Sequence, residues 1–264
     1  MKIAIITPYY KEDDEILAQC HQSVRNQTMA CDHFLVADGF PKAIVGNWQA
    51  KHIILANAHA DCGNTPRTLG ALSALNSGYD AIAFLDADNW YQPDHIARMV
   101  RLHRDTGAVV CTSNRSMHRP DGSYMFNDDK NDGTRHVDTS CFFMTRSVIT
   151  VLARWIAMPK QVAPVCDTVY LETIKRERLP YAHDPTPTVC FRTVYEADFL
   201  RLAEPMPIGV KTLAATDAPF HWVKALSAPE RKRLRHELGW PPGLPAKVAR
   251  RLGTMKARLV PSQN

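Results

Sequence analysis

The sequence lacks the features that would assign it to several common classes of protein. No two of its seven cysteines have the spacing of a zinc site or a redox motif. No apolar segment is long enough to cross a bilayer, and the N-terminal apolar run is too short for a signal peptide. Basic and aromatic residues do not alternate as they do in RNA-binding modules. The sequence therefore predicts a cytoplasmic protein with reduced thiols and no nucleic-acid partner.

Charge is distributed unevenly along the 264 residues. Residues 224–264 carry ten Lys and Arg against two Glu, a net charge of +8, which leaves −3 for the preceding residues. We therefore divide the chain into one large α/β domain, residues 1–222, and a basic, helical C-terminal extension, residues 223–264. The extension suits an anionic membrane surface at the inner face of the membrane, and it suits packing on the domain or on a dimer partner equally well.

Short apolar runs in the first ninety residues end at polar or charged residues. We expect buried strands at residues 3–6, 34–37, 52–55 and 81–85. A helix is predicted after the first run and another before the fourth, as in a doubly wound parallel sheet. In such a sheet the polar residues that follow the strands meet at one edge, where ligands bind.

The second half of the sequence has a less regular pattern. Further strands are predicted at residues 108–112, 137–144 and 189–192, and helices at 93–103, 148–157, 166–178 and 230–238. Residues 113–135 are rich in Asn, Asp and Gly and are expected to form a loop or an exposed hairpin. Recurring prolines favour an extended loop at residues 203–228, and a last basic segment covers residues 245–260.

Two carboxylates, Asp86 and Asp88, directly follow the apolar run at 81–85. Burying unpaired carboxylates is costly, so we expect the strand to leave the sheet here. Hard oxygen donors one residue apart suit a divalent cation that also contacts a diphosphate. A solvated turn with incidental acids is the alternative interpretation.

Five segments together resemble family 2 glycosyltransferases of the GT-A fold. They are residues 8–10, 23–28 (similar to S-V-x-x-Q-T), 36–39 (V-D-D-G), 63–70 (G-x-x-x-x-R-N-x-G) and 84–89 (F-L-D-x-D-D). The resemblance covers about the first three quarters of the chain. It implies a Rossmann-like α/β fold with a mostly parallel central sheet flanked by helices. The implied activity is inverting transfer of a sugar from a nucleotide-diphosphate-sugar, such as a UDP-sugar, to a hydroxyl acceptor in surface polysaccharide or glycolipid synthesis.

The resemblance also implies a role for individual residues. The nucleotide-sugar would be bound by Thr7, Pro8, Tyr9, Asp38, Arg67 and Asp86. Asp88 would bind Mg²⁺ or Mn²⁺, which stabilises the leaving diphosphate. Inversion needs a base for the acceptor hydroxyl, and Asp167 matches the acid that opens a helix in the family. Asp138 is a second acid on that side, predicted to contact the acceptor.

Three departures from the family pattern alter this picture. Lys11 replaces an Asn, Ala37 replaces the first acid of V-D-D-G, and the late Arg-x-His lacks its histidine at residues 192–194. We predict that His221 replaces that histidine as a metal ligand, with His183 as the second candidate.

Three other functions remain open from the sequence. A retaining transferase would not need Asp167. A nucleotidyltransferase of related fold would usually have a glycine-rich loop after the first strand, and residues 7–10 contain no glycine. A non-catalytic nucleotide-sugar or carbohydrate-binding protein would account for the missing histidine.

Overall fold

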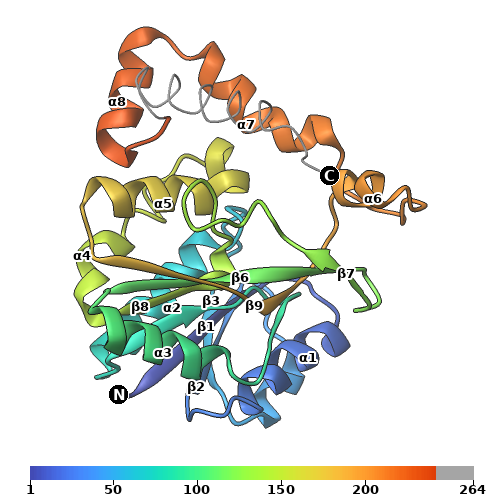
Figure 1. The fold of residues 1–264 in the computed structure, drawn as a ribbon, viewed down its shortest axis with the longest axis vertical. Coiled ribbons are helices and arrows are strands. Elements are labelled where there is room, and N and C mark those ends of the chain that lie inside the picture. The colour runs from blue at the N-terminus through green and yellow to red at the C-terminus, as the bar shows by residue number, and fades with distance from the viewer. Residues whose placement is uncertain (242–264) are drawn as a thin grey trace, which may run out of the picture.

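A computed structural model describes residues 1–241 of the chain. Its described part contains one nine-stranded sheet in the order β3-β2-β1-β4-β8-β6-β9-β5, with β7 paired to β6. Helices cover both faces of this sheet: α1 and α3 lie below it in Figure 1, and α5 lies above it. The predicted α/β fold with a mostly parallel central sheet is therefore confirmed.

The first half of the chain forms the regular parallel part of the sheet. The strands and helices in order are β1 (Ile3–Tyr9), α1 (Asp14–Arg25), β2 (Asp32–Asp38), η1 (Ala43–Asn47), β3 (Lys51–Leu55), α2 (Asn64–Asn76) and β4 (Ala81–Phe84). β1 pairs in parallel with both β2 and β4, and β2 pairs in parallel with β3. Every residue of β1 and β4 is buried, as expected for strands covered on both faces.

Gly70 lets α2 lie directly on this part of the sheet. A Cβ atom at Gly70 would approach Ile6 Cγ2 to 2.7 Å and Val36 Cγ2 to 2.8 Å. Neither distance is compatible with a side chain, so the glycine sets the separation between helix and sheet. The close packing fixes the first turn of α2, which carries Arg67, relative to the ends of β1 and β4.

The second half of the chain forms a mixed extension of the sheet. Its elements are β5 (Trp90–Tyr91), α3 (His95–Thr106), β6 (Val110–His118), β7 (Tyr124–Asn127), η2 (Thr139–Cys141), β8 (Phe142–Thr145), η3 (Arg146–Val148), α4 (Ile149–Leu152), η4 (Lys160–Val165), α5 (Cys166–Arg176) and β9 (Tyr181–Arg192). β8 lies antiparallel between β4 and β6, while β6 and β9 run in parallel. The strand that carries Arg115, β6, is thereby separated from β4 only by β8.

Several predicted elements need correction in this half. Residues 113–118 were expected in a loop or exposed hairpin, but they continue the buried strand β6. The end of that strand, residues 116–118, pairs with β7, so a hairpin is present and includes part of the strand. β9 starts at Tyr181, eight residues before the predicted strand, because Pro185 and Pro187 are accommodated by register shifts against β6. The strand predicted at 137–144 starts as the 3₁₀ turn η2, and the helix predicted at 148–157 is a single turn, α4.

Three further helices follow β9: α6 (Glu196–Leu202), α7 (Leu213–Ala225) and α8 (Ala228–Leu238). The extended loop predicted for 203–228 is confirmed only for residues 203–212 and is wrong for 213–225, where α7 forms and Thr212 caps it by accepting a hydrogen bond from the Ala215 amide. Pro219 lies inside this helix. α8 begins with a capping box of Ser227 and Glu230, which confirms the predicted helix at 230–238. α7 packs on η4 and α8 on α5 (Figure 1).

The described residues include only part of the C-terminal region for which predictions were made. The boundary predicted between residues 222 and 223 falls inside α7, and the division into domains stays a prediction. The basic segment at 245–260 lies outside the described residues, so its contact with a membrane or a dimer partner stays a prediction too. Among residues 1–241, none of the helices combines the length and the apolar character needed to span a bilayer.

Candidate active site

The carboxyl ends of β1, β2 and β4 form one edge of the sheet, as the sequence predicted. Tyr9 and Asp38 are the last residues of β1 and β2, and Asp86 and Asp88 follow β4. β1 is hydrogen-bonded to both neighbours, with Tyr9 opposite Ala37 and Ile6 opposite Phe84. The predicted donor-binding residues of these three strands therefore lie along a single edge.

Arg67 and Asp86 form an ion pair at this edge, in which Arg67 is buried and Asp86 is partly exposed. Arg67 is 2% exposed, and its Nη2 donates to Asp86 Oδ1 at 2.7 Å. Its Nη1 donates to Asn64 Oδ1 at 3.2 Å, and the guanidinium lies 5.0 Å from the centre of the Trp155 ring. Burial raises the pKa of Asp86, and the charge of Arg67 opposes this rise. The pair holds Asp86 in one orientation beside the end of β1.

Asp88 has a different environment although it lies only two residues further along. In the described part of the chain its carboxylate forms no ion pair and no hydrogen bond with another side chain. Burial, together with the charge of Asp86, raises its pKa from 3.8 to about 7. The site thus contains a carboxylate that has no ion-pair partner among the described residues, although its charge opposes the fall that burial causes in the pKa of Arg192.

Hydrogen bonds of Asn89, Ser140 and Arg192 fix the loop that carries Asp88. Asn89 Nδ2 and the Asp86 amide both donate to Ser140 Oγ at 3.1 Å. Asn89 Oδ1 accepts from the Arg192 amide at 3.0 Å, and Arg192 Nε donates to the Asp88 carbonyl at 3.2 Å. Arg192 is the arginine of the incomplete Arg-x-His pattern. Its side chain supports the Asp88 loop through the backbone and does not contact the Asp88 carboxylate.

Three predicted donor-binding side chains already have protein partners. Thr7 Oγ1 hydrogen-bonds with His33 Nε2 at 2.8 Å, and the Tyr9 hydroxyl does so with His52 Nε2 at 2.7 Å. Pro8 is buried and lies against Gly63. Thr7 and Tyr9 are therefore oriented by histidines of the sheet, and their own binding of a nucleotide stays a prediction.

Asp38 is paired with His59, a residue that the sequence did not indicate. The carboxylate accepts from the His59 amide at 3.1 Å and lies 2.6 Å from His59 Nδ1. A Cβ atom at Gly39, whose φ is +81°, would lie 2.5 Å from the Ala58 amide nitrogen. The residue after Asp38 must therefore be glycine for this loop to approach. The glycine of the motif at 36–39 was visible in the sequence. Nothing in the sequence indicated that the loop with Ala58 and His59 would pack against it.

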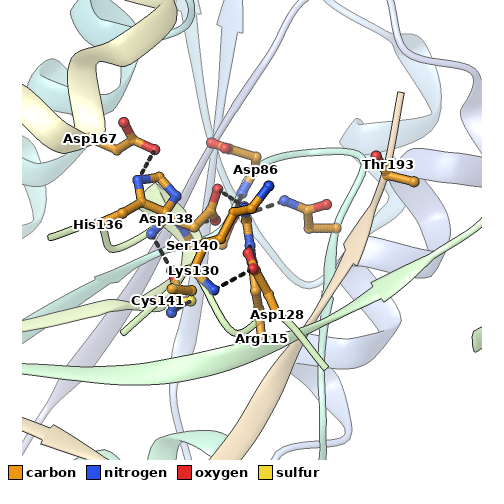
Figure 2. A network of polar contacts seen from close by, with 12 residues as sticks. Asp86, Arg115, Asp128, Lys130, His136, Asp138, Ser140, Cys141, Asp167 and Thr193 are labelled. Carbon is orange, nitrogen blue, oxygen red and sulfur yellow. Dashed lines mark hydrogen bonds and ion pairs between the residues drawn. The ribbon is translucent and has the colours of Figure 1, made fainter. Parts of the chain in front are cut away.

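On the far side of Asp86, Arg115 forms a buried network with two acids (Figure 2). Its Nε donates to Asp128 Oδ2 at 2.8 Å and its Nη1 donates to Asp138 Oδ2 at 2.6 Å. Asp138 Oδ1 accepts from the Ser140 amide at 2.9 Å, and Asp138 is only 6% exposed. Both oxygens of Asp138 are therefore used inside the protein, and its predicted contact with an acceptor stays a prediction.

Asp167 lies in the first turn of α5 and faces the same site. Its Oδ1 accepts from the Thr168 amide at 2.5 Å, and its Oδ2 lies 3.7 Å from His136 Nδ1 (Figure 2). The side chain is 17% exposed. The phenol of Tyr195 lies close enough to Asp167, Asp138 and Asp88 that their charges add to the effect of burial and raise its pKa. Tyr195 is thus within electrostatic reach of both the predicted base and the acids of the site.

The two candidate histidines lie elsewhere. His221 is exposed on α7, and His183 on β9 hydrogen-bonds with Thr112 Oγ1 at 2.9 Å. Neither has a hydrogen bond or an ion pair to Asp86 or Asp88 among the described residues. Residues 1–241 also contain no cluster of three or more His, Cys, Asp or Glu arranged around a metal site. Metal binding by His221 therefore stays a prediction without a contact to support it.

Sequence and structure comparisons identify the family and the fold of the chain. The model of the family described as "Glycosyl transferase family 2" matches residues 4–150, which is more than half of the chain. The chain belongs to glycosyltransferase family 2. The matched region contains the edge with Asp38, Arg67, Asp86 and Asp88, and it ends before Asp167. A search of curated proteins found no match.

Solved structures of S. aureus TarS share the fold of this family member. TarS itself is 12% identical with a TM-score of 0.55, and the match covers 76% of this chain and 38% of TarS. Its 1–349 fragment in complex with UDP is 11% identical with a TM-score of 0.57, covering 90% of this chain and 79% of the fragment. The fragment in complex with UDP-GlcNAc is 10% identical with a TM-score of 0.56, covering 73% and 59%. At these identities the likeness concerns the fold alone.

Proposed function

We propose that this family 2 glycosyltransferase moves a hexosyl or N-acetylhexosaminyl group from a UDP-sugar to a hydroxyl acceptor, with inversion and with a divalent cation. The main observation in support is the carboxylate of Asp88. It has no cationic partner in the described part of the chain and lies at the strand edge that α/β proteins use for ligands. TarS, which shares the fold, is described in complex with UDP and with UDP-GlcNAc.

The nucleotide is proposed to bind along the ends of β1 and β2. Asp38 accepts the ring N–H of the base with the lone pairs that His59 leaves available, a charge-assisted hydrogen bond. Thr7, Pro8 and Tyr9 form the adjacent wall. The ion pair of Arg67 and Asp86 then faces the ribose and the diphosphate, with Asp86 31% exposed toward them.

The residues present fit a divalent cation of the Mg²⁺ type. Magnesium is usually held by one or two carboxylates together with substrate phosphates and water, and not by a complete protein cage. Asp88 offers one carboxylate that forms no ion pair among the described residues, and Asp86 Oδ2 is not used by Arg67. When bound, Mg²⁺ or Mn²⁺ would neutralise charge on the diphosphate.

Transfer itself needs a group that accepts the proton of the acceptor hydroxyl. We assign this role to Asp167, which is partly exposed and held by the Thr168 amide. The acceptor oxygen forms a bond to the anomeric carbon while its proton passes to the Asp167 carboxylate. The bond from the anomeric carbon to the phosphate oxygen breaks on the opposite face, and its electron pair leaves with the diphosphate. The anomeric configuration is thereby inverted.

A nucleotide-sugar panel tests this function directly. Wild-type protein is incubated with UDP- and GDP-sugars and Mn²⁺, alone and with a series of sugar acceptors, and release of the nucleoside diphosphate is measured. We expect release from a UDP-sugar, and a decrease in kcat of about 100- to 10,000-fold for Asp167→Asn with unchanged UDP affinity.

Two outcomes would contradict the proposal. Binding of UDP-sugars in a thermal-shift assay with no release under any condition would favour a non-catalytic binding protein. Full activity of Asp167→Asn would remove the assignment of the base and would leave the donor site intact.

A further inference from the structure

A segment of the C-terminal half returns to the site after β9. Residues 193–212, here called the arm, leave the end of β9, form α6 and run back to the start of α7 (Figure 1). At their end, the Lys211 amide donates to the Val194 carbonyl at 2.6 Å. The Glu196 amide donates to the Lys211 carbonyl at 3.0 Å. The two ends of the arm are therefore tied together beside the Arg192 residue that supports the Asp88 loop.

The arm is fixed by an apolar cluster of its own. Phe199 of α6 is 1% exposed and packs with residues of the hairpin and of β9, separately from the main core. The members of this cluster are Met117, Met125, Phe191 and Phe199, with Phe126, Tyr195 and Val210 packed against them. Because Val210 and Tyr195 belong to the cluster, the backbone position of Lys211 is defined by packing.

Lys211 carries a positive charge that the protein does not pair. Its Nζ lies 5.3 Å from the centre of the Tyr195 ring, and it forms no ion pair among the described residues. Tyr195 follows Arg192 by three residues, and Arg192 Nε donates to the Asp88 carbonyl at 3.2 Å, so the ammonium lies on the side of the site that supports the Asp88 loop. Burial raises the pKa of Cys62, which precedes α2, and the Lys211 charge opposes this rise.

The three arginines around the site are already engaged. Arg67 is bonded to Asp86, and Arg115 to Asp128 and Asp138. Arg192 donates to the Asp88 and Pro120 carbonyls and to Gln19. Among these residues Lys211 is therefore the cation able to meet a negatively charged ligand without first losing a protein partner.

We infer that Lys211 binds the diphosphate of the donor and stabilises it as it leaves. This inference rests on the proposed function. A lysine ammonium is a compact charge on a flexible stem and serves as a point-charge ligand for phosphate. Lys211 approaches from the arm, whereas Asp86 and Asp88 approach from the sheet. A donor bound at the edge would thus have its phosphates between the acidic loop and the ammonium, where negative charge develops in the transition state.

Binding of uridine, UMP and UDP to Lys211→Met and Lys211→Arg tests the inference. Isothermal titration with Mn²⁺ measures each affinity, and Lys224→Met, an exposed lysine of α7, serves as the control. We expect Lys211→Met to bind UDP about tenfold more weakly, to bind uridine as wild type does, and to lose further activity in kcat. Lys211→Arg keeps the charge and should recover most of the UDP affinity.

The outcomes separate this inference from the function on which it rests. If wild type binds UDP and Lys211→Met binds it equally well, the inference is wrong and the proposed function stands. If Lys211→Met loses uridine and UDP affinity by the same factor, the residue acts only on the structure of the site, and the inference is again wrong. If wild type binds none of the three ligands, both proposals fall.

Discussion

Two groups of charged residues in the site, here called the floor and the rim, contain the same residue types but differ in whether these residues form ion pairs. The floor consists of the ion pairs Arg67–Asp86 and Arg115–Asp138, whose members are mostly buried and bonded to one another. The rim consists of Asp88 and Lys211, which form no ion pair among the described residues. Asp86 and Asp88 belong to one short motif, yet only Asp86 forms an ion pair among the described residues. We therefore expect Asp86 to meet a ligand with one oxygen while Arg67 holds the other, and Asp88 to meet it with its whole carboxylate.

The floor and the rim are expected to affect the stability of the folded protein in opposite directions. A buried ion pair is costly to form but far more costly to break, because one charge is then left without a partner. An uncompensated carboxylate already destabilises the folded protein when it is ionised, so its removal should relieve the fold. Substitutions in the floor and in the rim should therefore change the free energy of unfolding with opposite signs.

Breaking the floor at Arg115 should have the largest effect. Arg115→Met leaves Asp128 and Asp138 buried without their cation, so we expect a loss of about 3–5 kcal/mol in the free energy of unfolding. Urea denaturation measures this loss, and Arg101→Met, at an exposed position of α3, is the matched control. A loss below about 1 kcal/mol would mean that the network is not the support we describe.

The adjacent acids Asp86 and Asp88 provide the sharpest contrast. At about pH 8, Asp86→Asn should lose on the order of 3 kcal/mol because Arg67 remains buried and unpaired. Asp88→Asn should gain up to about 4 kcal/mol, since the pKa of Asp88 is raised to about 7 and its ionised form is disfavoured in the folded state. Denaturant unfolding of both variants, at several pH values, measures the two changes.

The pH dependence of the Asp88 effect has a defined sign. The unfolded chain ionises Asp88 near its ordinary value of 3.8, and the folded protein does so only near 7. The folded state therefore loses stability as the pH rises between these values, and the loss is complete above about 7. The gain from Asp88→Asn should be largest at alkaline pH and should vanish near pH 4. A gain independent of pH, or a loss at both residues, would contradict the distinction between floor and rim.

The donor half was predictable because its signals are local. The strands β1, β2 and β4 are short apolar runs, and each ends at residues that cannot continue in a dry core. Their order along the chain specifies a parallel sheet, so the meeting of Asp38, Asp86 and Asp88 at one edge follows from the sequence. Burial of Arg67 was less evident, since its partner Asp86 is contributed by a different element.

The second half was less predictable because its stability depends on distant partners. The β6 segment around Arg115 is polar and resembles a loop, but Asp128 and Asp138 compensate its charge inside the protein. Recurring prolines favoured a loop where α7 forms, and the cap at Thr212 starts that helix before Pro219. The strand predicted at 189–192 was too short, because register shifts against β6 let β9 include Pro185 and Pro187. Lys211 lies beside Tyr195 only because the arm folds back, and no pattern in the sequence indicates that return.

The most direct test of the account is the metal dependence of UDP binding by Asp88→Asn. UDP is titrated into wild type and variant at about pH 8, once with MnCl₂ and once with EDTA. We expect Mn²⁺ to increase the affinity of wild type about tenfold or more, and to leave the weaker affinity of Asp88→Asn unchanged. An equal increase in both proteins would show that Asp88 does not bind the cation, and would contradict the role that we assign to the rim.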